Sequence, residues 1–265
     1  MSGKTAMLGN SLAATLRDLA RACRILKMEG HGDVTMGHLT LRDPDGRGFW
    51  MKRSGIGMGE MREASDFLLL DFDGRRLYGD GAMHIEWPLH AEIFRARPDV
   101  NVIGHTHPFH ATTFSATRVP LRSVAHDGAM FGGTVPYYTG TSSLIDTPEL
   151  GRALARSLGD APAILMRNHG ITYVGDNMMH TTLVGIFLEK ACKAQLTLAA
   201  SNMPWSWPEA EEFALKAQQL ATPSLVAAFW DFFNRELDRQ EGVLGRNDPV
   251  PLPAPAAPRP ARKRA

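Results

Sequence analysis

Apolar residues recur at helical spacing in several segments of the chain. The first segment lies between Ser11, a residue type favoured at helix N-caps, and Gly30, a residue type that often ends helices, so we predict a helix over Ser11–Met28. The same spacing predicts later helices over Pro88–Ala96, Pro108–Ser115, Thr147–Leu158, Asn177–Ala200, Pro208–Leu220 and Pro223–Glu241.

Short apolar runs bounded by turn residues predict strands between these helices. They cover Val34–Arg42, Gly48–Lys52, Phe67–Phe72, Arg76–Tyr78, Val100–His105, a short run near Val135, Ala163–Met166 and Ile171–Val174. Turn sequences at 43–46 (Asp-Pro-Asp-Gly) and 73–74 (Asp-Gly) join the first four runs into hairpins. Hairpins that alternate with helices indicate an α/β protein, a three-layer α/β/α sandwich around a mixed, largely antiparallel sheet.

The composition narrows the class of protein. With 44% hydrophobic and 22% charged residues among 265, we expect one domain over residues 1–247 and a disordered Pro/Ala/Arg-rich tail over 248–265. The formal net charge of +1 gives no basic field for nucleic acid. No apolar run approaches the roughly 20 residues that cross a bilayer, and the start lacks a signal-peptide pattern. With only two cysteines, Cys23 and Cys192, we expect a cytoplasmic protein that contacts neither nucleic acid nor membrane.

Two histidines follow the apolar run Val100–Ile103, which has the pattern of a strand. Side chains at i and i+2 of a strand point to the same face, so His105 and His107 can reach one metal ion. A third histidine, His169, stands just after the predicted strand Ala163–Met166. Three protein ligands with an open position are typical of a catalytic metal site. Any one of these histidines, taken alone, is equally compatible with a structural role.

Three motifs together resemble the class II aldolase/adducin family over Ser11–Ala200. They are Gly-His-Thr-His-Pro at 104–108, His-Ile-Glu-Trp-Pro-Leu-His at 84–90, and Arg-Asn-His-Gly at 167–170. The resemblance implies an α/β/α fold, one divalent metal ion per subunit, and homotetramers with active sites near subunit contacts. It also implies that His105, His107 and His169 hold the ion, which is Mn, Zn, Co or Fe, and that Glu86 is an acid/base or a further ligand.

The sequence departs from the sugar-phosphate members of that family at the residues that hold the phosphate. Those members typically carry Gly-Asn-x-Ser, a Ser/Thr-Gly pair and two serines before the carboxylate. Here the corresponding residues are Gly-His-Leu-Thr at 37–40, Ser54-Gly55 and His84-Ile85. Replacing hydroxyl groups with Ile and His weakens an anion cradle. The motif sequences are instead similar to those of a branch of metal-dependent decarboxylases that act on dihydroxyphthalate and hydroxypyridine dicarboxylate. That branch also includes some non-haem iron oxygenase relatives.

Several residues beside these motifs are candidates for contact with a small acidic substrate. They are Lys52, Arg53, Ser54, Gly55, His38 and His84. A guanidinium matches a carboxylate, although Lys52 and Arg53 are also compatible with a solvated strand end. His38 and His84 are alternatively surface residues, and His90 either supports the site or packs in the core.

We therefore predict a divalent-metal-dependent carbon–carbon lyase. The favoured reaction is decarboxylation of a hydroxylated aromatic or heteroaromatic (di)carboxylate, with Glu86 delivering the proton. The first alternative is a class II aldolase that cleaves a ketose (phosphate) through an enediolate. The second is a non-catalytic, adducin-like oligomeric interaction module, against which the complete set of three histidines argues.

Overall fold

A mixed sheet of eight strands runs through the part of the chain that the computed structural model describes, residues 10–131 and 135–244. Its order is β4-β3-β2-β1-β5-β8-β7-β6, and every neighbouring pair is antiparallel except β6 with β7. The strands are β1 (His38–Arg42), β2 (Phe49–Lys52), β3 (Phe67–Leu70), β4 (Arg76–Tyr78), β5 (Val102–Thr106), β6 (Tyr137–Tyr138), β7 (Ala163–Met166) and β8 (Gly170–Gly175).

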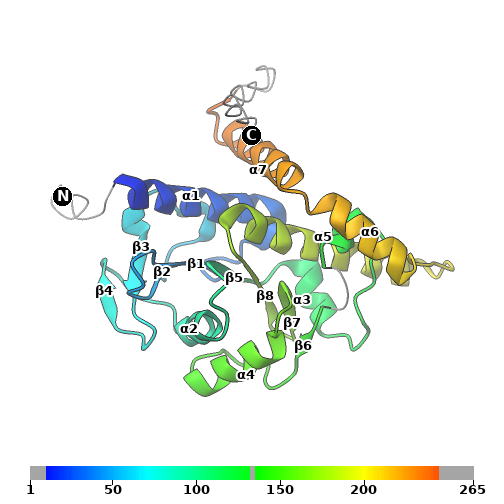
Figure 1. Cartoon of the computed structure of the whole chain (residues 1–265), viewed down its shortest axis with the longest axis horizontal. Helices are drawn as coiled ribbons and strands as arrows, with labels where there is room; N and C mark the ends of the chain where they lie inside the picture. The colour runs from blue at the N-terminus through cyan, green and yellow to red at the C-terminus, as the bar shows by residue number, and fades with distance from the viewer. Residues whose placement is uncertain (1–9, 132–134, 245–265) are drawn as a thin grey trace, which may run out of the picture.

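Helices cover both faces of the sheet, so the expected three-layer α/β/α architecture is confirmed (Figure 1). The helices are α1 (Asn10–Leu26), α2 (Trp87–Ala96), α3 (Phe109–Ser115), α4 (Pro148–Leu158), α5 (Met178–Ser201), α6 (Ala210–Leu220) and α7 (Pro223–Gln240). Helices α1 and α5 lie on one face, and α2 and α4 lie on the other (Figure 1). None of the helices described is both long and apolar enough to span a membrane.

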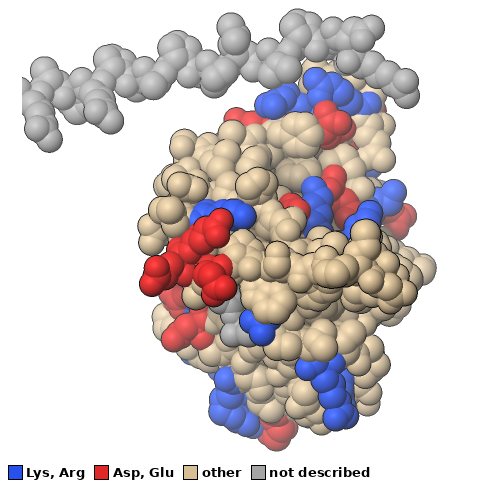
Figure 2. Space-filling view, turned by 90° about the vertical axis from the view of Figure 1, so that its right-hand side faces the viewer, with Lys and Arg blue, Asp and Glu red and all other residues tan. Residues whose placement is uncertain are grey.

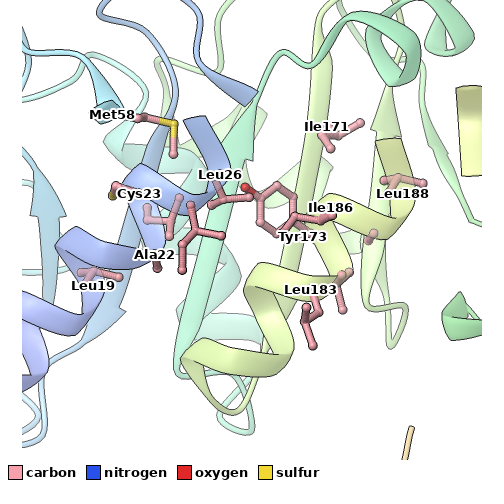
Figure 3. Packing of buried hydrophobic residues seen from close by; sticks show 14 of the residues in the cluster. Leu19, Ala22, Cys23, Leu26, Met58, Ile171, Tyr173, Leu183, Ile186 and Leu188 are labelled. Carbon is pink, nitrogen blue, oxygen red and sulfur yellow. The ribbon is translucent and has the colours of Figure 1, made fainter. Parts of the chain in front are cut away.

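The larger core lies between the sheet and the layer formed by α1 and α5. Figure 3 shows Leu26 of α1 and Ile186 of α5 flanking the ring of Tyr173 on β8. Tyr173 pairs with Gly104 across β5 and β8, and a Cβ atom added at Gly104 would lie 2.2 Å from that ring. Glycine is therefore required at Gly104 because the aromatic ring occupies the space that any side chain would need. This contact fixes one face of β5. The side chains of His105 and His107 point to the opposite face.

Charged side chains of both signs lie on the face shown in Figure 2, together with a larger uncharged area. This distribution agrees with the formal net charge of +1. The expected tail over 248–265 lies outside the described residues.

Two expectations from the sequence were wrong in detail. The first strand begins at His38 instead of Val34, because Val34 and Gly37 adopt left-handed φ angles of 46° and 74°. Val34 and Met36 are 84% and 49% exposed, so their apolar character does not reflect burial in the sheet. Ser11 lies within α1 and therefore does not cap it, whereas Gly30, with φ of 90°, breaks the helical geometry inside the turn Lys27–His31 that follows α1.

Candidate metal centre

The strand β5 and the residue after it present two imidazoles to a common point. The Nε2 atoms of His105 and His107 lie 3.1 Å apart. The Nδ1 atom of His105 lies 3.0 Å from the carbonyl oxygen of Ile171, so Nδ1–H donates to it and the lone pair falls on Nε2. The Nδ1 atom of His107 lies 3.2 Å from a carboxylate oxygen of Asp33, which fixes the same tautomer. A carboxylate or carbonyl behind the imidazole is the usual support for a metal-binding histidine.

The loop between β7 and β8 adds the third imidazole. His169 follows Asn168, whose φ of 56° turns the chain sharply, and the ring of His169 stacks on that of His107 at 5.4 Å between centroids. Gly170 allows this approach, because a Cβ atom there would lie 2.6 Å from the His107 ring. One ligand nitrogen from each of His105, His107 and His169 lies within 4.8 Å of the others.

Glu86 completes the cluster from the other side. It stands just before α2, is 5% exposed, and its Oε1 atom accepts a hydrogen bond of 2.8 Å from the backbone N–H of Ile145. The same oxygen lies 3.6 Å from Nε2 of His169, and Oε2 lies 3.5 Å from Nε2 of His105. The carboxylate therefore faces the same point as the imidazoles.

The electrostatics of the cluster suit a cation. Burial, reinforced by the neighbouring histidines, lowers the pKa of His107 to about 3 and that of His169 to about 4, so both rings are neutral at neutral pH. Burial alone would raise the pKa of Glu86, but the contacts with His105 and His38 outweigh it and lower that pKa, so Glu86 is a carboxylate.

The donor set fits the divalent ion expected from the sequence. The Nε2 atom of His169 is buried and has no hydrogen-bond partner among the described residues, which is costly for a polar atom unless a ligand binds it. Three imidazole nitrogens with one carboxylate beside them match Mn, Zn, Co or Fe equally well. The His/Glu cluster is thus a candidate site for one divalent metal ion.

Two adjoining cavities open onto the cluster and share Met36, His107 and Leu144. The larger one has a volume of about 580 Å³ and is lined by apolar and small polar side chains, among them Phe109, Thr112 and Thr113. The smaller one is lined by His38, His84, Ile85 and Glu86, among others. No lysine or arginine of the described residues lines either cavity, so a bound anion would meet the metal centre and hydroxyl groups instead of a basic side chain.

The structure separates the candidate substrate-binding residues into two groups. His38 and His84 line the smaller cavity, with their ring centroids 4.5 Å apart. The backbone N–H of Ser54 donates to the carbonyl of Ala82 at 2.8 Å. This bond places Ser54 and Gly55 beside the segment that leads from Ala82 to Glu86.

Lys52 and Arg53 have other partners. The ammonium of Lys52 is buried and contacts the carbonyl oxygens of Thr35 (3.1 Å) and Arg53 (3.3 Å) and the Nε2 atom of His84 (3.1 Å), which engages its three protons. Burial also lowers its pKa to about 8. The guanidinium of Arg53 lies 3.6 Å from Asp66. Lys52 therefore has no free ammonium proton with which to bind a substrate carboxylate, the role expected of this pair.

Some residues of the site were not anticipated from the sequence. Asp33 lies just before the predicted strand Val34–Arg42, and no sequence pattern marked it as the partner of His107. Ile145 acts through its backbone N–H, which no side-chain pattern reveals. His90, left open between packing and support, bonds both His38 and Thr40, and the i, i+2 spacing of those two on β1 was the available signal.

Comparison with known proteins agrees with this fold. The class II aldolase and adducin N-terminal domain family matches residues 17–196, which is more than half of the chain. The protein belongs to that family.

Individual relatives differ in what their names describe. The 3,4-dihydroxyphthalate decarboxylase of Arthrobacter keyseri is 29% identical over 197 residues, covering 69% of this chain and 78% of that protein. The meiotically up-regulated gene 14 protein of Schizosaccharomyces pombe is 30% identical over 190 residues, covering 71% and 74%. Among solved structures, L-fuculose 1-phosphate aldolase from Glaciozyma antarctica PI12 is 25% identical with a TM-score of 0.76, covering 92% of this chain and 94% of that one.

Proposed function

We propose that this protein is a divalent-metal-dependent carbon–carbon lyase that decarboxylates a hydroxylated aromatic or heteroaromatic acid. The observation that carries the proposal is the convergence of His105, His107 and His169 on the point faced by the Glu86 carboxylate. The three imidazoles would hold the ion. When bound, the ion would act as a Lewis acid toward the substrate oxygen next to the breaking bond.

Glu86 is suited to move one proton within this reaction. As a carboxylate it takes the proton of the substrate hydroxyl group, and the carboxylic acid so formed lies against the substrate. The bond between the ring carbon and the leaving carboxylate breaks, carbon dioxide departs, and Glu86 returns its proton to that ring carbon. The product oxygen then takes one proton from solvent, so the reaction consumes one proton for each carbon dioxide released.

The chemistry of the cavities favours an aromatic acid over a sugar phosphate. Apolar side chains, including Met36, Phe109 and Leu144, offer flat contact area for a ring. No described lysine or arginine lines either cavity, so a phosphate would have only hydroxyl groups such as those of Thr112, Thr113 and Ser142 and no basic side chain. His84 and Ile85 occupy the positions before Glu86 where paired hydroxyl groups would strengthen such a cradle. The relative named as a 3,4-dihydroxyphthalate decarboxylase supports the same substrate class.

Aldol cleavage of a ketose is the second candidate, and one observation favours it. Ser54 and Gly55, which the family resemblance assigned to phosphate, lie beside the segment that leads to Glu86. The structural similarity to an L-fuculose 1-phosphate aldolase supports this candidate too. In that reaction Glu86 would move a proton at the enediolate carbon. A purely structural, adducin-like role would leave the buried Nε2 atom of His169 without a hydrogen-bond partner or a ligand among the described residues.

Product analysis distinguishes the two lyases. The metal-loaded protein is incubated with a panel of hydroxy-aromatic mono- and dicarboxylates and, separately, with ketose phosphates, and the products are identified by mass spectrometry. The proposal expects loss of carbon dioxide from at least one aromatic acid, abolished by a chelator and restored by Mn or a similar ion. Aldehyde release from a ketose phosphate, with every aromatic acid unchanged, would overturn it in favour of the aldolase.

A further inference from the structure

A chain of three buried side chains lies behind Glu86. The Nδ1 atom of His38 on β1 lies 2.7 Å from Nε2 of His90 on α2, and Nδ1 of His90 lies 2.8 Å from Oγ1 of Thr40 on β1. His90 and Thr40 are fully buried, and His38 is 2% exposed. The remaining nitrogen of His38, Nε2, points at Oε2 of Glu86 from 3.8 Å.

The sheet and one helix create this arrangement. β1 pairs with β5 so that His38 stands directly opposite His105, and Thr40, two residues on, points to the same face. Helix α2 begins immediately after Glu86 and places His90 one turn later, under both β1 residues. The ring of Phe49 stacks near that of His90, at 6.4 Å between centroids, and closes the space around it.

Hydrogen bonding makes the chain directional. Burial lowers the pKa of His90 far below its usual range, so this imidazole carries a single N–H. Burial also lowers the pKa of His38 to about 4, so each of the two rings carries one N–H, and either every proton points toward Glu86 or every proton points toward Thr40. In the second case the Thr40 hydroxyl would have to donate to the carbonyl of Ile103 at 3.4 Å, a long contact for an O–H donor. In the first case the hydroxyl donates to His90 at 2.8 Å and needs no other partner.

We propose that Thr40, His90 and His38 form an aligned hydrogen-bond chain in which His38 is a positioning residue that offers its Nε2–H to the Glu86 carboxylate. The inference rests on the proposed function, because it gives that carboxylate the acid/base role. His38, expected from the sequence to touch substrate, thereby acts on Oε2 while the backbone N–H of Ile145 holds Oε1. The backbone N–H of Ile145 bonds Oε1, and the Nε2 atom of His38 faces Oε2 from 3.8 Å, so each carboxylate oxygen has a donor directed toward it.

Nitrogen NMR tests the alignment without any turnover. The zinc-loaded protein is labelled with ¹⁵N in its histidine rings, and the His38 and His90 signals are assigned from the signals lost in His38→Gln and His90→Gln. Protonated and unprotonated ring nitrogens have well-separated shifts, so each tautomer is read directly. The chain predicts that both rings carry the proton on Nε2. A proton on Nδ1 of either ring in the wild-type protein would overturn the inference.

Two substitutions at Thr40 provide the matched comparison. Thr40→Val keeps the shape and removes the hydroxyl, so His90 and His38 should each show a mixture of tautomers, whereas Thr40→Ser should keep the single tautomer. An unchanged tautomer pattern in Thr40→Val would also overturn the inference. If decarboxylation is observed, kcat should fall about tenfold in Thr40→Val, with KM and metal content unchanged and recovery in Thr40→Ser. Absence of decarboxylation with the expected tautomers would count against the proposed function alone.

Discussion

His107 and His169 each contribute one nitrogen to the cluster. His107→Ala or His169→Ala leaves two imidazoles, which hold a divalent ion far more weakly than three. We expect the purified wild-type protein to contain about one ion per subunit and each variant to contain little or none, measured by plasma mass spectrometry. His126→Ala is the matched control, because His126 is exposed and lies outside the cluster, and it should keep the metal. Full occupancy in both ligand variants would place the ion elsewhere.

The sequence revealed the residues of the site unevenly. His105 and His107 could be predicted from strand periodicity alone, because i, i+2 spacing on a strand places both side chains on one face. His169 and Glu86 come from distant segments, and only the family resemblance connected them with the pair. Asp33 and the N–H of Ile145 depend on how loops pack in three dimensions, which no local pattern encodes. The burial of Lys52 and its three partners are tertiary properties that the local sequence does not encode.

At the scale of elements, β5 is held from both faces. Gly104 must accept the ring of Tyr173 on one face for His105 to reach the metal centre on the other. Gly104→Ala should cost roughly 1–3 kcal/mol of unfolding free energy through overpacking, and it should weaken metal binding because the strand shifts. Urea unfolding and metal titration measure the two effects. Adding Tyr173→Leu to Gly104→Ala should recover part of the metal affinity, and strictly additive losses would argue against the contact.

Most elements followed from the spacing of apolar residues, and the exceptions have a physical cause. The helices α2, α4, α5 and α7 begin and end within a few residues of their predicted positions. The predicted strand Val34–Arg42 included the loop before β1, yet Val34 in that loop adopts a left-handed φ angle. The side chains of Asp33 and Lys52 hold that loop by bonding His107 and the Thr35 carbonyl, and such distant contacts override local preference.

For the whole molecule, buried neutral histidines predict a dependence of stability on pH. His31 is fully buried, and burial lowers its pKa to about 3, whereas the unfolded chain binds the same proton near pH 6.5. The contribution of His31 to the free energy of unfolding is complete above pH 6.5. It is lost as the pH falls toward 3, by about 1.4 kcal/mol per pH unit. Urea unfolding of the metal-free protein at several pH values measures the slope. His31→Asn should have a shallower slope by about that amount, and an identical slope would refute the assignment.

The assembly is a further property of the whole molecule. We expect a homotetramer, as the family resemblance implies, with the exposed apolar side chains around α6 and α7 as the available surface. Several of these side chains are substantially exposed, including Met203, Trp207, Leu215 and Phe232. Light scattering at micromolar concentration should report four times the chain mass of 29.1 kDa. A monomer under those conditions would contradict this expectation.

The central claim is that the histidine cluster and Glu86 form one metal-dependent lyase site. The most direct measurement follows carbon dioxide release from the best hydroxy-aromatic acid, together with metal content, for three preparations: metal-free protein, the same protein reloaded with metal, and reloaded Glu86→Gln. We predict no release from the first, turnover by the second, and full metal content in the third with turnover lower by about 10²- to 10⁴-fold. Release of carbon dioxide by the metal-free protein, or undiminished turnover by Glu86→Gln, would contradict the claim.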